Sequence, residues 1–527
     1  MKKKSTPLPD DVELLKKMLL EQQTKLERQL AQKDKRIAKL ETLNQKLTER
    51  VQRFEEVLNL AQHKRFSPSS ETYEGDGQVF NEAEQVLETE TEPEQAPDTD
   101  APAFETTVEK PAKEPAKLRR PRIAPELPRT EVLHDIDNKT CTCCGYALHR
   151  MGEEVSEQVE FIPAEIRVIK HVRPKYSCRA CEREGTQVSI QIADVPESII
   201  PKSMATPSLL AQIVSNKMHY GLPLYRQEKM FSEAGIELSR QTMSRWLITC
   251  ADKLQSLMQL MKAELLKQPV LWADETTLDV LEVDKSTCYM WVYGCGVEGS
   301  SGAKLVLFDY QDGRSGQHAV QFLEGYSGYL QVDGYAGYEQ TSATLAGCWA
   351  HARRKFIEAQ QAQGKGKTGK ADWAINQIQK LYALESKLKT QSFEVKQQQR
   401  QLVAAPLLQQ LWDWLEKSQN TIPKESLVGK AISYTQNQWP KLIRYLEDGQ
   451  LNIDNNRAER AVKPFVIGRK AWLFANTRTG ATGSAVLYSM VETAKINGLE
   501  PCKYLTELFE KLPTANTPAD LAKLLPY

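Results

Sequence analysis

The sequence has no run of about 18 apolar residues, the approximate length that a membrane-spanning helix requires. It also has no apolar segment after its basic start, MKKKSTPLPDD, so a secretory signal peptide is not indicated. We therefore expect a soluble, unexported protein that works in the cytoplasm and has no membrane partner.

The sequence also lacks net charge, because 69 Lys and Arg residues balance 69 Asp and Glu residues. This balance excludes a uniformly basic nucleic-acid binder but allows basic patches that an acidic segment offsets. Residues 67–128 contain such a segment, ETETEPEQAPDTDAP, which has too few apolar side chains to build a core. We interpret 67–128 as a disordered linker. The chain of 527 residues is long enough for about three or four folded units.

Proline and glycine are absent from residues 12–58, where apolar side chains repeat every seven residues. The two sets of heptad positions hold Leu19, Leu26, Leu40, Leu47 and Phe54 (d) and Leu30, Ile37, Val51 and Leu58 (a). Asn44 is a polar residue at an a position, where asparagine commonly fixes register. This pattern predicts a coiled coil within 1–66 through which the chain self-associates. A long amphipathic helix packed on its own chain is the alternative.

Four cysteines stand in two pairs with two-residue spacing, Cys141 with Cys144 and Cys178 with Cys181. In an unexported protein this spacing is typical of a four-thiolate site for structural Zn²⁺. The residues between the pairs alternate as hairpin strands do, which predicts a zinc ribbon over 129–196. Two unrelated buried pairs are the alternative.

Residues 197–266 have a helical pattern that includes LYRQEKMFSEAGIELSRQTMSRWL. A helix that ends at Gly235, a short turn and a second helix capped by Ser239 are typical of a helix-turn-helix. Arg240 and Arg245 on the second helix are candidates for DNA contact. An ordinary helical hairpin has the same pattern.

Two acids follow apolar runs that read as buried strands. Asp274 follows VLWA, and Asp333 follows YLQV. A buried acid is costly unless it is paired or binds a metal, although a turn-capping Asp is the ordinary explanation for either one. The strand and helix patterns around them predict a mixed sheet with helices on its faces over 267–359, then a helical insertion over 360–450.

A third acid, Glu459, lies in the run NIDNNRAERAVKPFVIGRKAWLF among many basic residues. A plain DNA-binding patch would omit it, because a carboxylate repels phosphate. Its presence is explained if the acid holds a cation that itself contacts phosphate. We assign 451–485 to a second part of the catalytic core and 486–527 to a C-terminal helical element.

Several of these segments together resemble the insertion sequence 66 family of bacterial transposases. The matching segments are ADET at 273–276, QVDGYAGY at 331–338, CWAHARRKF at 348–356, DNNRAERAVKPFVIGRKAWLF at 454–474 and VETAKINGLEP at 491–501. The resemblance extends from about residue 127 onward, and the predicted coiled coil also suits the family. It implies a multidomain protein whose RNase H-like α/β catalytic domain carries an Asp-Asp-Glu triad at Asp274, Asp333 and Glu459.

The chemistry of transposition agrees with these three acids. Carboxylates are hard oxygen ligands suited to Mg²⁺, and two such ions can activate the attacking oxygen and stabilise the leaving oxygen of a phosphodiester. The partners implied are the terminal repeats of the transposon, target DNA and accessory proteins encoded by the same element. The enzyme would be nucleoid-associated when bound to DNA. The candidate DNA contacts are Arg240, Arg245, Arg353, Arg354, Arg460, Lys463, Arg469 and Lys470.

Two other functions remain open from the residues alone. One is a non-catalytic DNA-binding regulator built from the coiled coil, ribbon and helix-turn-helix. The other is an RNase H-like nuclease without strand transfer, which has the same chemistry at its acids. The spaced acids favour an enzyme, and the family resemblance favours a transposase.

Overall fold

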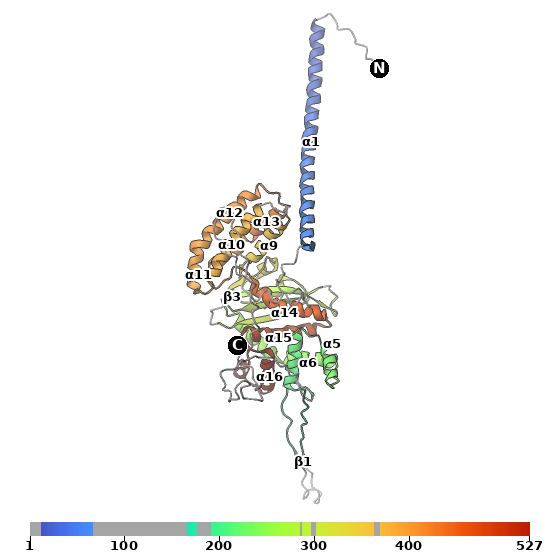
Figure 1. Cartoon of the computed structure of the whole chain (residues 1–527), viewed down its shortest axis with the longest axis vertical. Helices are drawn as coiled ribbons and strands as arrows, with labels where there is room; N and C mark the ends of the chain where they lie inside the picture. Colours follow the sequence, from blue (N-terminus) through green and yellow to red (C-terminus); the bar gives the residue numbers. More distant parts are fainter. Residues whose placement is uncertain (1–11, 67–165, 177–190, 285–286, 297–301, 363–368) are drawn as a thin grey trace, which may run out of the picture. The chain divides into compact units, whose positions relative to one another are not determined.

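The computed structural model describes residues 12–66, 166–176, 191–284, 287–296, 302–362 and 369–527 (Figure 1). The chain divides into two compact units, one of residues 1–94 and 193–527 and one of residues 95–192. The predicted acidic linker and the four predicted zinc ligands lie outside the described residues. None of the helices within the described ranges has both the length and the apolar character needed to cross a membrane.

The amino-terminal helix α1 (Val12–Phe66) is continuous over 55 residues. The segment with the heptad pattern is therefore helical. Its heptad side chains are exposed, with Leu26 at 60% and Leu47 at 51%. An exposed apolar stripe of this length is typical of a helix that pairs with another helix.

The smaller unit contributes two short paired strands. β1 (Lys175–Tyr176) and β2 (Gln191–Ile192) are antiparallel, with Lys175 opposite Ile192. Because β2 lies beyond the second cysteine pair, this pairing is not the hairpin predicted between the two pairs, most of which lies outside the described residues.

Four helices lie between β2 and the main sheet. They are α4 (Pro207–Met218), α5 (Leu224–Glu233), α6 (Arg240–Lys253) and α7 (Gln255–Leu265). Ser239 caps α6, because its Oγ accepts a hydrogen bond from Thr242 N at 3.2 Å. Gly235, in the turn before it, has a φ of +84°, a conformation that glycine adopts without strain. The predicted pair of helices and its cap are confirmed, and DNA contact by α6 stays a prediction.

The main sheet is mixed, as the apolar runs predict. Its strand order is β5-β4-β3-β6-β7, and β8 pairs with the far end of β3. The first three strands are antiparallel neighbours, whereas β3, β6 and β7 are parallel. The strands are β3 (Val270–Val280), β4 (Cys288–Cys295), β5 (Leu305–Gln311), β6 (Tyr329–Gln331), β7 (Thr344–Ala346) and β8 (Phe474–Ala475). Between β5 and β7 lie α8 (Gly316–Phe322) and η1 (Ala336–Gln340).

The outer edge of β5 is closed by side chains of α15 (Arg478–Ile496). Val306 N donates to Thr493 Oγ1 at 3.1 Å, and this hydroxyl donates to Val306 O at 3.0 Å. Ser489 Oγ accepts a hydrogen bond from Phe308 N at 2.8 Å. Because an open edge strand leaves backbone groups unpaired, these hydroxyls complete the sheet on that side.

Helix α14 (Asn456–Trp472) packs against β3 and β4 through the apolar face that includes Ala458, Val462 and Phe465. The Phe465 ring lies 5.3 Å from that of Tyr488 in α15 and 6.2 Å from that of Phe308 in β5. This aromatic contact joins α14 to the sheet and to α15, so it fixes the helix that carries Glu459.

A helical insertion separates β7 from α14, as the sequence predicts. Its helices gather in one group in Figure 1 and have a core of their own. The insertion follows α9 (Trp349–Gln361) and contains α10 (Lys370–Leu388), α11 (Phe393–Gln399), η2 (Arg400–Ala404), α12 (Ala405–Gln419), α13 (Leu427–Leu442) and η3 (Ile443–Leu446). The rings of Trp412 and Trp439 lie 5.0 Å apart, tilted by 43°, and both pack against this core.

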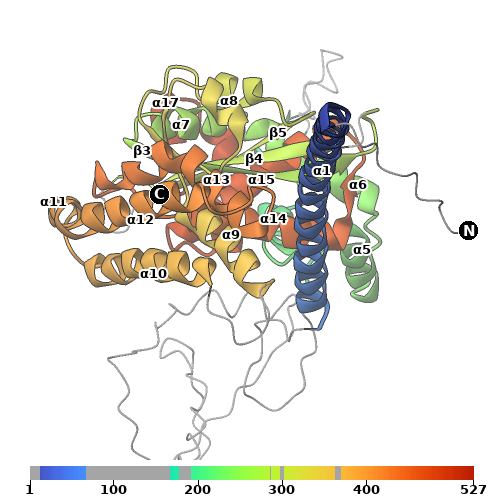
Figure 2. The same cartoon turned by 90° about the horizontal axis from the view of Figure 1, so that it is seen from above.

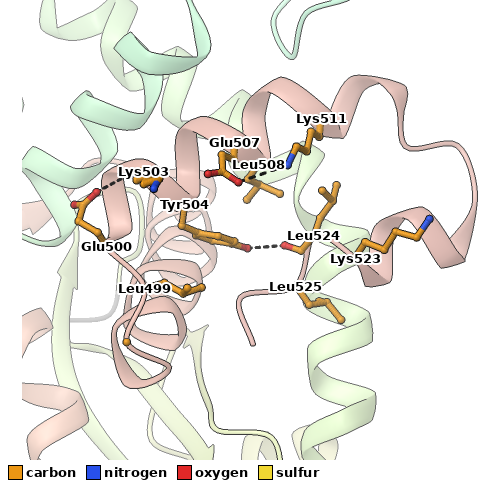
Figure 3. A pocket seen from close by; sticks show the side chains of 11 residues that line it. Leu499, Glu500, Lys503, Tyr504, Glu507, Leu508, Lys511, Lys523, Leu524 and Leu525 are labelled. Atoms are coloured by element: carbon orange, nitrogen blue, oxygen red, sulfur yellow. Dashed lines mark hydrogen bonds and ion pairs between the residues drawn. The ribbon is translucent and has the colours of Figure 1, made fainter.

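The C-terminal element contains α16 (Pro501–Lys511), η4 (Leu512–Thr514) and α17 (Pro518–Ala522). A groove of about 480 Å³ lies between α16 and the last residues of the chain (Figure 3). The Tyr504 side chain reaches across this groove, and its hydroxyl donates a hydrogen bond to Leu524 O at 2.9 Å. None of the residues predicted to act in catalysis lines this groove.

Candidate active site

Two of the three predicted catalytic acids come from neighbouring parallel strands. β3 and β6 pair with Trp272 opposite Gln331. Asp274 lies two residues further along β3, and Asp333 lies two residues beyond the end of β6. Side chains two positions apart on a strand share a face, and neighbouring strands lie about 4.8 Å apart. The register therefore brings the two acids to the same end of the paired strands, and the charge of Asp333 contributes to the raised pKa of Asp274.

Two buried side-chain amides hold the segment that leads to the third acid. Gln331, 2% exposed, donates from Nε2 to Asn452 O at 2.8 Å and accepts from Asn452 N at 3.2 Å. Asn455, 3% exposed, donates from Nδ2 to Ala273 O at 2.9 Å. Because Ala273 precedes Asp274, Asn455 ties the start of α14 directly to the strand that carries the first acid.

Glu459 lies in the first turn of α14, four residues after Asn455. The N-cap of this helix is Asn455 rather than Asp454, although Asp454 Oδ1 accepts a hydrogen bond from Asn456 N at 3.2 Å. The helix start thus reaches β3 through Asn455, and the charge of Glu459, from a distant part of the chain, contributes to the raised pKa of Asp274. Among the described residues, the ligand atoms that group within 4.8 Å are those of Glu459, Cys348 and His351, and this group includes neither aspartate.

The electrostatics of Asp274 show that the three acids influence one another. The pKa of its carboxyl is raised to about 7, and burial is the largest cause. The neighbouring Glu275 is the next cause that raises it, whereas a hydrogen bond from Glu275 N lowers it. Asp333 and Glu459 then raise the pKa further. Acids that repel one another in this way fit a divalent cation, whose charge offsets the repulsion and which prefers carboxylate oxygens.

Glu459 has basic and imidazole neighbours from α9. Its Oε2 lies 3.8 Å from Arg354 Nη2, and its Oε1 lies 3.9 Å from His351 Nδ1. Cys348, His351 and Glu459 offer ligand atoms that all lie within 4.8 Å of one another. The Cys348 Sγ accepts a hydrogen bond from Asn455 N at 3.2 Å, and burial raises the pKa of this thiol to about 12.

Glu275, beside the first acid, has a structural role. Its side chain is 1% exposed and faces away from Asp274, as the alternation of a strand predicts. Its carboxylate accepts hydrogen bonds from Arg314 Nε at 2.9 Å and from Tyr338 Oη at 2.6 Å. These partners occupy the Glu275 carboxylate, which leaves Asp274 rather than Glu275 available to a metal.

The helical insertion also reaches the site. A Cβ at Gly334, directly after Asp333, would lie 2.8 Å from the hydroxyl of Tyr434 in α13. Burial and then the charge of Asp333 raise the pKa of Tyr434 to about 12, so the phenol is protonated near neutral pH. Sequence reasoning missed Tyr434, and only the glycine after Asp333 hints at a close neighbour.

Comparison with known proteins assigns the chain to a family. A model described as "Transposase IS66 family" matches residues 202–483, which is more than half of the chain and includes all three acids. The chain belongs to this transposase family. Models for a "zinc-finger binding domain of transposase IS66", an "IS66 C-terminal element" and a "Transposase C of IS166 homeodomain" match residues 138–182, 489–527 and 53–132.

Similar curated proteins come from Sinorhizobium fredii (strain NBRC 101917 / NGR234), and each is described only as uncharacterized. The protein y4jD is 34% identical over 76% of this chain and 80% of its own length. The protein y4qI is 30% identical over 99% of this chain and 97% of its own length. No solved structure matches this transposase.

The basic residues proposed to contact DNA fall into two groups. Five are exposed and available to phosphate: Arg240, Arg245, Arg354, Arg460 and Lys470. The other three are partly buried. Arg353 donates to Gln379 Oε1 at 3.4 Å, Arg469 donates to the hydroxyl groups of Thr276 and Thr277 on β3, and burial lowers the pKa of Lys463. For these three, a structural role accompanies the proposed DNA contact.

The zinc-finger match in this transposase covers all four cysteines predicted to bind zinc, Cys141, Cys144, Cys178 and Cys181. A structural zinc is therefore supported by the family. The assignment of these four thiolates as its ligands remains our proposal.

Proposed function

We propose that this transposase binds the ends of its insertion sequence and catalyses metal-dependent cleavage and strand transfer of DNA through Asp274, Asp333 and Glu459. The observation that carries the proposal is the parallel register of β3 and β6, which aligns the two aspartates. The buried Asn455 then brings the helix that carries Glu459 to the same strand. Three antiparallel strands followed by two parallel ones also support an RNase H-like catalytic core.

The three carboxylates would hold divalent ions, most simply Mg²⁺. When bound, a pair of such ions supplies charge stabilisation to the attacking and leaving oxygens of an in-line displacement. The chain's own contribution is to orient the carboxylates and the DNA. Arg354 and Arg460, which are exposed near Glu459, are placed to hold the phosphate backbone beside the acids.

A direct assay tests this function. The full chain is incubated with DNA that contains the transposon ends, with a target plasmid and with Mg²⁺, and both nicked and joined products are scored. We expect both products, and we expect a metal chelator to remove them. Nicks without joined products would indicate a nuclease, and end binding without nicks would indicate a regulator. Parallel reactions with proteins encoded by the same element test whether accessory partners are needed.

The proposed zinc ligands lead to a separate prediction. Purified protein should contain about one zinc per chain by elemental analysis, because two paired-cysteine knuckles build one tetrahedral site. Replacement of a ligand, as in Cys144→Ser or Cys178→Ser, should remove the zinc and destabilise the ribbon. Cys143→Ser is the matched control and should keep the metal. A natively folded protein without zinc would contradict the assignment.

The exposed heptad of α1 predicts self-association through a second copy of this helix. Replacing Leu40 and Leu47 by Lys puts two charges at d positions and should lower the molar mass measured by light scattering. Replacing Ala31 and Gln32 by Lys adds the same charge outside the a and d positions and should leave the mass unchanged. A mass unaffected by the d-position changes would show that α1 does not hold the oligomer together.

A further inference from the structure

The surroundings of Glu459 contain two polar atoms that lack partners. Glu459 Oε1 and His351 Nδ1 are both buried, and neither has a hydrogen-bond partner in the described part of the chain. They face each other at 3.9 Å, which is too far for a direct hydrogen bond. Buried polar atoms are nearly always satisfied, so a third atom that binds both is expected between them.

The geometry of the two helices favours a metal ion as that third atom. His351 lies in the first turn of α9 and Glu459 in the first turn of α14, and both helices appear in Figure 2. The two helix starts are joined by the hydrogen bond from Asn455 N to Cys348 Sγ and by one from Trp349 N to Ile453 O at 3.1 Å. This backbone connection fixes the imidazole and the carboxylate relative to each other before any ligand binds.

Cys348 completes the trio of potential ligands, but its geometry gives it another role. Cys348 is 3% exposed, and its sulfur already accepts a hydrogen bond from the Asn455 amide. It therefore acts as a link between α9 and α14. His351 and Glu459 are the two members of the trio whose ligand atoms have no other partner.

We propose that His351 supplies an imidazole nitrogen ligand to the cation held by Glu459. This inference rests on the proposed function, which makes Glu459 a metal ligand. Mg²⁺ prefers a shell of oxygen atoms, whereas Mn²⁺ and later first-row ions accept imidazole more readily. A site of two aspartates, one glutamate and one histidine should thus bind Mn²⁺ more tightly than Mg²⁺.

Metal binding by the full chain, loaded beforehand with one equivalent of zinc for the proposed cysteine site, tests the proposal without DNA. The loss of the free Mn²⁺ signal in electron paramagnetic resonance gives the Mn²⁺ affinity, and competition gives that of Mg²⁺. We expect His351→Ala to weaken Mn²⁺ binding by at least about tenfold while Mg²⁺ binding changes by less than about threefold. The control is His219→Ala, which removes a half-buried histidine at the C-cap of α4. It should alter neither affinity.

A spectroscopic measurement identifies the ligand atom itself. Electron spin echo modulation from bound Mn²⁺ should show coupling to nitrogen in protein labelled with ¹⁵N-histidine. The coupling should vanish in His351→Ala and also in His351→Gln, which keeps a polar side chain of similar length. Absence of the coupling in the wild-type protein, or equal losses of Mn²⁺ and Mg²⁺ affinity, would overturn the proposal and leave a bridging water between the two side chains.

Glu459→Gln separates this inference from the function on which it rests. If that change removes Mn²⁺ binding but His351→Ala does not, the imidazole assignment alone fails. If Glu459→Gln leaves Mn²⁺ binding unchanged, the metal site of the proposed function fails as well.

Discussion

Replacing any one of the three acids by its amide, as in Asp274→Asn, Asp333→Asn and Glu459→Gln, should reduce cleavage and strand transfer by at least about 1000-fold. This loss corresponds to about 4 kcal/mol of transition-state stabilisation, which is within the range that a bound metal supplies. Each amide keeps the shape of the side chain but removes the charge that holds the cation. The measurement is the yield of nicked and joined DNA in the assay with transposon ends and Mg²⁺.

Binding to the transposon ends should survive these changes, and a gel-shift titration checks this. The ribbon and the α5–α6 pair, which we expect to recognise DNA, are separate segments of the chain. Removing a carboxylate near phosphate should even tighten binding. Asp279→Asn, an exposed acid on the same strand as Asp274, is the matched control and should remain active. Normal cleavage by Glu459→Gln together with loss of cleavage in Asp454→Asn or Glu492→Gln would mean that the triad is misassigned.

The second large effect concerns stability. Arg400→Met should destabilise the helical insertion by about 3–5 kcal/mol, because it removes a buried charge and leaves the partly buried Glu385 and three carbonyls without their partner. The Arg400 side chain is 2% exposed and makes two hydrogen bonds to Glu385, at 2.8 and 2.7 Å. It also donates to the backbone carbonyls of Tyr445, Asp448 and Leu451 at 2.8, 2.9 and 2.9 Å. Methionine fills much of the volume but satisfies none of these acceptors.

Urea unfolding followed by tryptophan fluorescence measures this change, since the insertion core contains Trp373, Trp412, Trp414 and Trp439. Lys389→Met, at the exposed end of α10, is the control and should change the free energy of unfolding by no more than about 0.5 kcal/mol. An unchanged unfolding midpoint in Arg400→Met would show that the network adds no net stability. The carbonyls bound by Arg400 belong to the segment just before Asn452 and Asn455. Because that segment leads into α14, which carries Glu459, the variant should also lower the yield of nicked and joined DNA.

The sequence predicts the parts of this site that depend on local pattern. Apolar runs before Asp274 and Asp333 indicate buried strands, and β3 and β6 lie there, although β3 continues past Asp274 to Val280. The Ser239 cap is equally local, since it depends on residues three apart. The sheet directions follow from the short stretches of sequence between the first three strands and from the helix that separates β5 from β6.

Contacts between distant residues could not be predicted in the same way. Asn455 binds the carbonyl of a residue 182 positions earlier, and Cys348 accepts its amide across 107 positions. No periodicity encodes such pairs. In the sequence, Arg400 lies in a Gln-rich helical segment, which indicates a solvent-facing side chain. Its burial is favourable only because the folded insertion brings several backbone carbonyls to its guanidinium group. The roles of Tyr434 and His351 depend on the same long-range packing.

The insertion between β7 and α14 has a consequence for the nascent chain during its synthesis on the ribosome. Ribosomes add roughly 5–20 residues per second, so the 126 positions that separate Asp333 from Glu459 take about 6–25 s to translate. During that interval the emerging polypeptide has two acids of the proposed triad but neither the third nor the helices that seat it. The insertion can meanwhile form its own core. We therefore expect that a nascent transposase still attached to its ribosome cannot cut the DNA around it until α14 and α15 have emerged and docked on the sheet.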